Sequence, residues 1–187
     1  MPEIGPSRSR DAGAGLAQEF RIRQVESEDI PLVTALAGHI WRRHYPSIIG
    51  VEQTEAMLAG LYALDALARQ MAAGQHYLLM EDGHQQAVGF GAWSRYDPGL
   101  GGPGVTRLYL DPAWQGRGLG QRLFQALRDA LSATGAAPVR LRVNRRNVQA
   151  INFYFRHGFV IERALDEYYD QRWLLDDFLM IDDGSVS

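Results

Sequence analysis

A short glycine-rich turn is the part of this sequence whose residue types and spacing could do chemistry. It comprises residues 115–120, Gln-Gly-Arg-Gly-Leu-Gly, and stands between a predicted strand and a predicted helix. Glycines at alternate positions allow successive backbone N–H groups to converge on one point, and the N-terminus of the following helix adds its partial positive charge. A pyrophosphate is the ligand that such a turn is best suited to bind.

Two other phosphate-binding motifs do not fit this turn. A dinucleotide-binding fingerprint needs a third glycine three residues after the second, but Gln121 and Leu123 occupy the two possible positions. A Walker loop needs a lysine, whereas all 19 basic residues of the chain are arginines. The remaining alternative is a plain strand-to-helix turn in which the glycines serve close packing.

The turn is expected to be positioned by a mixed α/β sheet with helices on both faces. Alternating apolar residues predict short strands, and leucines at four-residue spacing from Leu119 to Leu131 predict the helix after the turn. The predicted strands are residues 20–25, 76–80, 87–94, 105–110, 139–143, 159–163 and 178–181. The other predicted helices are residues 27–43, capped by Ser27 and ended by Pro46, 51–71, and 147–156, ended by Gly158.

Turn-forming residues mark the connections. Asp82-Gly83 predicts a tight turn that joins strands 76–80 and 87–94 in a hairpin. Residues 97–104 are rich in glycine and proline, which predicts an irregular, mobile loop. A polar and aromatic connection is expected around residues 168–173, before the last strand.

Length and composition favour one globular domain. Of the 187 residues, 46% are hydrophobic and 22% charged, and we expect a disordered leader at 1–19, the domain at 20–181 and a tail at 182–187. The net charge of −3 argues against a nucleic-acid partner. No apolar stretch is long enough to span a membrane, so we expect a cytoplasmic protein. The absence of cysteine excludes disulfides, thiolate metal sites and thiol nucleophiles.

Two motifs, in this order, resemble those of the Gcn5-related N-acetyltransferase (GNAT) family. Residues 115–120 match the pattern Gln/Arg-x-x-Gly-x-Gly/Ala, which is similar to the family's acyl-CoA signature. Residues 141–159 resemble its strand, asparagine, Ala-x-x-x-Tyr helix and Gly-Phe ending, and residues 176–180 resemble its closing strand. The resemblance covers about residues 20–181. It implies a mostly antiparallel central sheet of about seven strands and acetyl-CoA as the cosubstrate.

The resemblance also implies which residues bind the cofactor. The backbone of residues 108–110 would pair with the pantetheine arm, and N–H groups from Gly116 to Gln121 would hold the pyrophosphate, with a charge-assisted contact from Arg117. Asn147 would reach the cofactor arm. The predicted cofactor-binding residues are Leu108, Tyr109, Leu110, Gln115, Gly116, Arg117, Gly118, Leu119, Gly120, Gln121, Asn147 and Tyr154.

Two residues are predicted to be catalytic. Acyl transfer to an amine needs a neutral amine, a stabilised oxyanion and a proton for the departing thiolate. Tyr154 lies on one helical face with Asn147, and its phenol, with an ordinary pKa of about 10 against about 8.5 for a thiol, is the expected general acid. By resemblance, the backbone N–H of Leu110 would bind the oxyanion. The alternatives are a core aromatic role for Tyr154 and a helix cap for Asn147.

The general base is not identified by any motif. An amine of pKa about 10.4 is almost fully protonated at pH 7, so a base or a water chain must remove its proton. The candidates that could face the acceptor are His44, Tyr45, Tyr96, Asp97, Arg107, Tyr109, Glu167, Tyr168 and Tyr169.

The acceptor is expected to be a primary amine of a small molecule. Residues 41–57, with Trp41, Tyr45, Ile48 and Gln53, resemble the acceptor-side helices of family members that include polyamine acetylators, which suggests a polyamine-like substrate. Two alternatives stay open: a non-catalytic module that binds acyl-CoA, and an enzyme that acetylates a peptide amino terminus. Family members are often dimers, so a homodimer is a further expectation.

Overall fold

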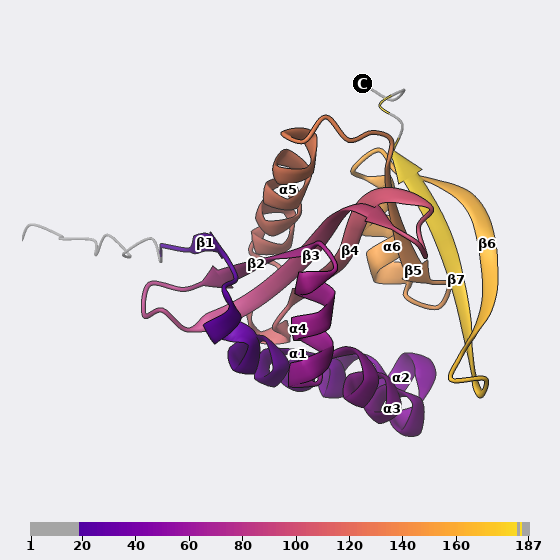
Figure 1. The fold of residues 1–187 in the computed structure, drawn as a ribbon, viewed down its shortest axis with the longest axis horizontal. Helices are drawn as coiled ribbons and strands as arrows, with labels where there is room; N and C mark the ends of the chain where they lie inside the picture. The colour runs from indigo at the N-terminus through magenta and orange to yellow at the C-terminus, as the bar shows by residue number, and fades with distance from the viewer. Residues whose placement is uncertain (1–18, 183, 185–187) are drawn as a thin grey trace, which may run out of the picture.

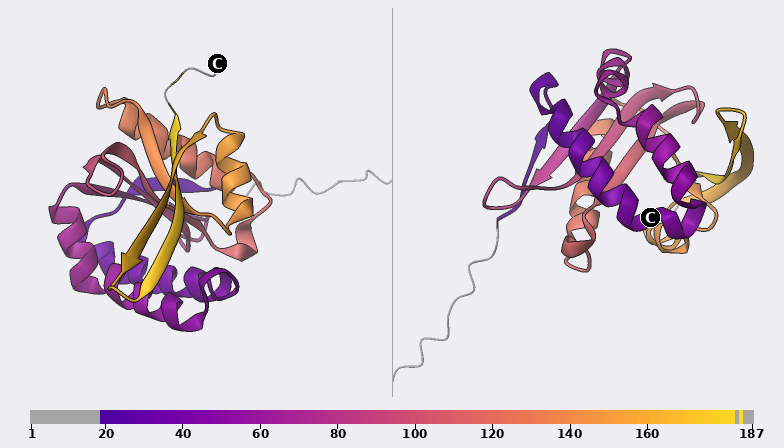
Figure 2. Two further views of the ribbon diagram at one scale, coloured as in Figure 1. Left: turned by 90° about the vertical axis from the view of Figure 1, so that its right-hand side faces the viewer. Right: turned by 90° about the horizontal axis from the view of Figure 1, so that it is seen from below.

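The computed structural model describes residues 19–182 and 184. They form a seven-stranded sheet in the order β1-β2-β3-β4-β5-β7-β6, with helices on both faces (Figures 1 and 2). All neighbouring strands are antiparallel except β4 and β5. The predicted fold class, a mixed and mostly antiparallel sheet, is confirmed. The predicted leader at 1–19 and tail at 182–187 fall outside the described residues, apart from residues 19, 182 and 184.

Every predicted strand is present, although several are longer than expected. The strands are β1 (Arg21–Gln24), β2 (Gln75–Glu81), β3 (Ala87–Asp97), β4 (Gly102–Leu110), β5 (Val139–Asn144), β6 (Val160–Tyr169) and β7 (Trp173–Asp182). The helices are α1 (Ile30–His44), α2 (Pro46–Ile49), α3 (Val51–Leu61), α4 (Leu64–Ala72), α5 (Leu119–Ser132) and α6 (Val148–Phe155), with short 3-10 helices η1 (Ser27–Asp29) and η2 (Pro112–Trp114).

The sheet separates two hydrophobic cores. On one face, α1, α3 and α4 pack aromatic side chains such as Trp41 and Tyr62 against Phe90 of the sheet. On the other face, α5 buries its row of leucines, and α6 packs beside it. Leu123 and Leu127 are completely buried, and each such side chain contributes about 1.5–3 kcal/mol relative to an exposed position. These two cores hold β4 and the helix after the glycine turn in fixed positions.

The helical region before β2 differs from the prediction. Four α-helices, not two, precede β2, because the predicted helix 51–71 is broken at Tyr62 and Ala63 and because Pro46–Ile49 form the additional helix α2. Tyr62 ends α3 and is 1% exposed, with its ring packed against Trp41 and Phe90. Pro46 does not simply end α1 but occupies the first position of α2, where its missing N–H has no cost.

The predicted cap at Ser27 is also replaced. Asp29 Oδ2 accepts a hydrogen bond from the Glu26 N–H at 2.9 Å, and Glu26 forms the other half of this capping box. Asp29 is further held by the Arg23 guanidinium, which lowers the pKa of its carboxyl group to about 2. The start of α1 is therefore tied to β1 rather than capped by a serine.

The prediction of a mobile loop at residues 97–104 is wrong. Only a tight turn separates β3 from β4, and β4 begins at Gly102. Leu100 anchors the turn because it is 3% exposed, and its N–H donates to the Asp97 carbonyl at 3.1 Å. At Gly104, a Cβ atom would lie 2.2 Å from the Arg140 carbonyl oxygen. Glycine here permits the close approach of two strands rather than flexibility.

The predicted aromatic connection at 168–173 is instead the tip of a long hairpin. β6 and β7 remain paired as far as Tyr169 and Trp173, and the turn residues Asp170 and Gln171 have φ values of 52° and 54°. Figures 1 and 2 show this tip beside α2 and α3. The hairpin therefore brings the end of the sheet to the helices from the start of the chain.

Candidate active site

β4 and β5 diverge in the middle of the sheet. These parallel strands pair only at Gly104 and Arg140, whereas β3 follows β4 as far as Leu110. Beyond Gly104, β4 therefore has no partner on its β5 side. Its backbone groups there can pair with an extended ligand, in the way that a peptide adds a strand to a sheet edge.

The glycine turn follows directly from the end of β4. Gly116 and Gly118 both have φ values of 75°, a conformation that residues with a side chain rarely adopt. Gly118 is the N-cap of α5 and offers no side-chain cap, so the N–H groups of the first helical turn have no partner within the helix. An added Cβ at Gly116, Gly118 or Gly120 would meet no atom within 4 Å. The donors and the open space fit an anion.

A cavity of about 730 Å³ connects the turn with the gap between β4 and β5. The predicted cofactor-binding residues that line it are Leu108, Tyr109, Leu110, Gln115, Gly116, Gly118, Gly120, Gln121, Asn147 and Tyr154. Arg117 and Leu119 do not line it. The Arg117 guanidinium carbon lies 4.9 Å from the centre of the Trp114 ring, and Leu119 is 6% exposed in the core, so these two can contribute only backbone groups without rearrangement.

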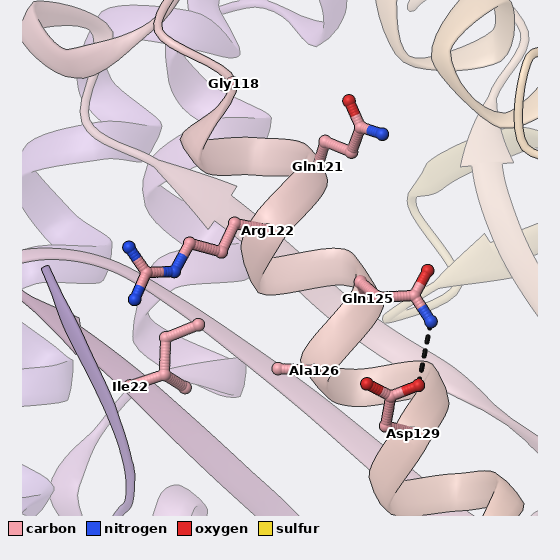
Figure 3. A pocket seen from close by; sticks show the side chains of 7 residues that line it. All are labelled: Ile22, Gly118, Gln121, Arg122, Gln125, Ala126 and Asp129. Carbon is pink, nitrogen blue, oxygen red and sulfur yellow. Dashed lines mark hydrogen bonds between the residues drawn. The ribbon is translucent and has the colours of Figure 1, made fainter.

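A second, shallower hollow lies beside the first turns of α5. Figure 3 shows Gly118 at the start of the helix, with the Arg122 side chain on the side of Ile22 and the Gln121 side chain on the other side. Arg122 Nη2 donates to the Phe20 carbonyl oxygen at 2.7 Å, which ties α5 to the residue before β1. This arginine is thus directed away from Gln121, the last residue of the turn.

Asn147 connects α6 with α1. Its Oδ1 accepts a hydrogen bond from the Ala150 N–H at 3.2 Å, so it caps α6, as the alternative interpretation expected. Its Nδ2 lies 3.2 Å from Nε2 of His44. Because an amide nitrogen only donates, the imidazole Nε2 accepts this bond and Nδ1 carries the proton.

Tyr154 lies on the cavity wall within an aromatic cluster. It is 8% exposed, and its ring packs 5.6 Å from Phe124 and 6.0 Å from Phe159. Burial, and next the nearby Tyr109, raise the pKa of Tyr154 above that of an ordinary phenol. Tyr154 is therefore protonated at neutral pH. Transfer of this proton to a free thiolate is uphill, so the phenol is suited to hydrogen-bond the sulfur while it departs.

The structure divides the candidate bases into two groups. His44, Tyr45, Asp97, Arg107, Tyr109 and Tyr169 line the cavity. Tyr96 and Tyr168 lie outside the cavity and are 66% and 67% exposed, and Glu167 Oε2 accepts a hydrogen bond from Arg142 at 2.8 Å. Burial lowers the pKa of His44 and raises that of Tyr45. The His44 imidazole and the Tyr45 phenol are therefore both uncharged at neutral pH.

Sequence reasoning missed an ion pair on the cavity wall. Arg142 of β5 and Asp177 of β7 both line the cavity, with Arg142 Nη2 3.1 Å from Asp177 Oδ2. Burial raises the pKa of Asp177, and the opposing effect of Arg142 is smaller. The available signal was the alternation of Arg140, Arg142 and Asn144 along β5, which places all three on one side of the strand.

The tip of the β6–β7 hairpin lies at the part of the cavity lined by Trp41, Tyr45, Arg107, Tyr109 and Tyr169, which we call the acceptor side. Gln53 of α3 donates to the Leu174 carbonyl oxygen at 3.5 Å, and Glu52 pairs with Arg172. The Tyr169 hydroxyl lies 1.8 Å from the place where a Cβ atom of Gly60 would be. Glycine at this position of α3 thus admits a tyrosine that also lines the cavity.

In residues 19–182 and 184 no group of three or more histidine, cysteine, aspartate or glutamate side chains could hold a metal ion. Over the same residues, no helix has the length and apolar character needed to cross a bilayer.

The sequence profile of the acetyltransferase (GNAT) domain matches residues 49–169. This chain therefore belongs to the GNAT acetyltransferase family. It is an acetyl-CoA-dependent N-acetyltransferase, so the open alternative of a non-catalytic module is not supported.

The individual relatives have low sequence identity to this chain. A spermidine N(1)-acetyltransferase from Thermoplasma acidophilum is 24% identical over 153 residues, which are 76% of this chain and 89% of that protein. A mycothiol acetyltransferase from a Nocardioides species is 32% identical over 152 residues, 75% of this chain but 48% of that protein. This chain thus corresponds to about half of the second relative.

A solved structure has the same fold. The PaiA N-acetyltransferase from Thermoplasma acidophilum, in complex with coenzyme A, superposes with a TM-score of 0.72 at 22% identity, covering 88% of this chain and 99% of that one. Membership of the GNAT acetyltransferase family confirms the expected cosubstrate, acetyl-CoA.

Proposed function

We propose that this enzyme transfers the acetyl group of acetyl-CoA directly to a primary amine of a small molecule. The supporting observation is that one cavity joins two unlike regions. One is the glycine turn with the open edge of β4, and the other is an aromatic region formed by α1, β4 and the β6–β7 hairpin. Tyr154 lines the same cavity, and no cysteine is present to carry the acetyl group.

The roles proposed for the cofactor side follow the geometry of the backbone. The N–H groups from Gly116 to Gln121 would bind the pyrophosphate, and the exposed edge of residues 108–110 would pair with the pantetheine arm. Asn147 is already used as a helix cap and as the partner of His44. Its contact with the cofactor would therefore require it to exchange its bond to His44.

The roles proposed for the reaction are carried by Tyr154 and Leu110. The Leu110 N–H would stabilise the negative charge that develops on the thioester oxygen. The Tyr154 phenol would donate a hydrogen bond to the departing sulfur, where negative charge also develops. Both groups would act most strongly in the transition state, which is what acceleration of the chemical step requires.

Thermal unfolding with and without acetyl-CoA tests the cofactor side, with NAD and ATP as controls. At a hundredfold excess over the dissociation constant, a ligand specific for the folded state adds about 2.7 kcal/mol, or roughly 5–10 °C in a domain of this size. We expect this shift with acetyl-CoA alone. Equal shifts with all three nucleotides, or none with acetyl-CoA, would contradict the proposed binding site.

A polyamine-like acceptor is a second candidate, favoured by the similarity to a spermidine N(1)-acetyltransferase. Mass spectrometry of reactions with spermidine, spermine and amino acids would identify acetylated products. Absence of any acetylated polyamine would exclude this candidate. Mass shifts on proteins but on no small amine would instead favour the peptide-acetylating alternative.

A further inference from the structure

Arg107 is a cationic residue in the wall of the acceptor side. It belongs to β4 and lies two residues before Tyr109, so both side chains are on the sheet face covered by α1, α3 and α4. Its guanidinium carbon is 5.7 Å from the centre of the Tyr62 ring, and Arg107 lines the same cavity as Trp41, Tyr45 and Tyr109.

Among residues 19–182 and 184, no carboxylate forms an ion pair with Arg107. None of the ion pairs formed by the described residues includes it. Nη1 donates to the Thr106 carbonyl oxygen at 2.7 Å, and Nε is buried without a hydrogen-bond partner. Nη2 makes no hydrogen bond to a described residue, and the Arg107 side chain is only partly buried. Nη2 is thus the part of the group that a ligand can reach.

Two further polar atoms in the core on this face of the sheet have no hydrogen-bond partner among the described residues. Trp41 Nε1 is buried with no hydrogen-bond partner. Tyr62 Oη has none of normal geometry either, although burial and the neighbouring Tyr109 phenol raise the pKa of Tyr62. Apart from the bond of Arg107 Nη1 to Thr106, the guanidinium and these two neutral groups therefore make no hydrogen bond to a described residue. Burying such a set is costly unless an anion or water satisfies it.

The two aspartates that line the cavity form no ion pair with Arg107. Asp177 is paired with Arg142, and Asp97 Oδ1 accepts the Leu100 N–H at 3.1 Å. Asp97 lies near enough for its charge to favour the cationic form of Arg107, but the two form no ion pair. The cavity wall also contains Arg156. A polyamine would thus bring additional positive charge to a wall that already contains an unpaired cation.

We propose that Arg107 binds a carboxylate of the acceptor, which makes the preferred substrate an amine that also carries a carboxylate. This inference rests on the proposed transfer to a small amine and specifies its substrate class. A guanidinium forms strong charge-assisted hydrogen bonds with a carboxylate. The amine of the same molecule would then point along β4 towards Leu110 and the cofactor side.

Matched acceptor pairs that differ only in the carboxylate test this proposal. Suitable pairs are ornithine with putrescine, lysine with cadaverine, and glutamate with 4-aminobutyrate, which loses one of two carboxylates. One charge-assisted hydrogen bond corresponds to roughly 10- to 100-fold in kcat/KM, so we expect the carboxylate-bearing member to be preferred by that factor. In Arg107→Gln this ratio should fall to near one, and Arg107→Lys should recover part of it.

The control is Arg95→Gln, which removes an exposed arginine of β3 that does not line the cavity. It should leave the ratio unchanged. Better turnover of putrescine than of ornithine, or an unaltered ratio in Arg107→Gln, would overturn the assignment of Arg107 while leaving the acetyltransferase proposal intact. If no amine reacts although acetyl-CoA raises the melting temperature, the proposed small-amine function fails, and this inference fails with it.

Discussion

The glycine turn and the acceptor side meet at one cavity, but they are built from different parts of the chain. The turn presents backbone N–H groups, and Gly116 and Gly118 set their directions through φ values of 75°. The acceptor side presents side chains such as Trp41, Arg107 and Tyr169, which come from α1, β4 and β6. One region is continuous in sequence, and the other is assembled only by folding.

This difference determines how each region can change. Backbone recognition tolerates varied side chains, and Arg117 and Leu119 indeed lie against Trp114 and the core rather than on the cavity. Recognition by side chains can be altered by one substitution. We therefore expect changes in the turn to weaken binding of the cosubstrate equally whichever acceptor is used. Changes on the acceptor side should instead affect the turnover of some acceptors more than that of others.

The largest effect is expected at Tyr154, where the two regions meet. Tyr154→Phe removes only the hydroxyl group, so the aromatic packing with Phe124 and Phe159 is kept. Because loss of one hydrogen-bond donor to developing negative charge costs about 10²- to 10³-fold, we expect kcat to fall by that factor with every acceptor. The dissociation constant of acetyl-CoA, measured by calorimetry, should change little.

Tyr168→Phe is the matched control, since Tyr168 is 67% exposed and lies outside the cavity. Its kcat should equal that of the unaltered enzyme. A Tyr154→Phe enzyme with full kcat would remove Tyr154 from the reaction and leave it as a core aromatic. A loss restricted to one acceptor would place it on the acceptor side instead.

Gly118→Val should separate binding of the cosubstrate from folding. A β-branched residue at a φ value of 75° costs about 1–3 kcal/mol of stability. It also moves N–H groups that would hold the pyrophosphate, so we expect acetyl-CoA to bind at least about 100-fold more weakly, as after the loss of two charge-assisted hydrogen bonds. Gly135→Val shares the strain, with a φ value of 72°, but lies after α5 and should bind acetyl-CoA normally.

Gly120→Ala gives the same test without strain, because Gly120 is inside α5 and its added methyl group would meet no protein atom within 4 Å. Alanine should raise the free energy of unfolding by up to about 1 kcal/mol, while its methyl group enters the cavity that Gly120 lines. Stability and affinity should thus move in opposite directions. Unchanged affinity in both variants would show that the turn is only structural.

The same contrast explains what the sequence could predict. The seven strands, the helix after the turn, the turn itself and the cap at Asn147 depend on residues close in sequence, and the structure has all of them. The ion pair between Arg142 and Asp177 was missed because the two residues are 35 positions apart and meet only through the pairing of β5 with β7.

The two main errors in the fold have the same cause. Gly60, two residues before Tyr62, only weakens a helix, and the break is fixed by burial of the Tyr62 ring against Trp41 and Phe90. The glycine-rich run before Val105 is held as a strand by Gly104, which pairs with Arg140. Local propensity was in both places overridden by tertiary contacts.

His44 of α1 connects the two regions through its hydrogen bond with Asn147. Its protonation can be followed through the pH dependence of stability. Its folded-state pKa is lowered by burial, so below the ordinary value of about 6.5 the unfolded chain binds more protons than the folded one. The free energy of unfolding should therefore fall as the pH is lowered from 6.5 to the folded-state pKa. In His44→Gln, urea titrations at pH 7 and pH 5 should show less of this loss.

His84→Gln is the control, since His84 is exposed in the turn between β2 and β3. It should retain the pH dependence of the unaltered protein. The same loss in His44→Gln and the unaltered protein would mean that other groups cause it, and that burial does not hold His44 neutral.

The smallest effects are expected where the β6–β7 hairpin meets α3. Gly60→Ala places a methyl group 1.8 Å from the Tyr169 hydroxyl, so the tyrosine must leave its place on the cavity wall. We expect the KM for the acceptor to rise by roughly 3- to 10-fold, equivalent to about 0.6–1.4 kcal/mol, with acetyl-CoA affinity unchanged. Arg172→Gln breaks an exposed ion pair with Glu52, worth at most about 1 kcal/mol, and the contact of the guanidinium with the Trp173 ring, and it should raise the KM less. If either variant weakened acetyl-CoA binding instead, the hairpin would belong to the cofactor side, and the division between the two regions would be wrong.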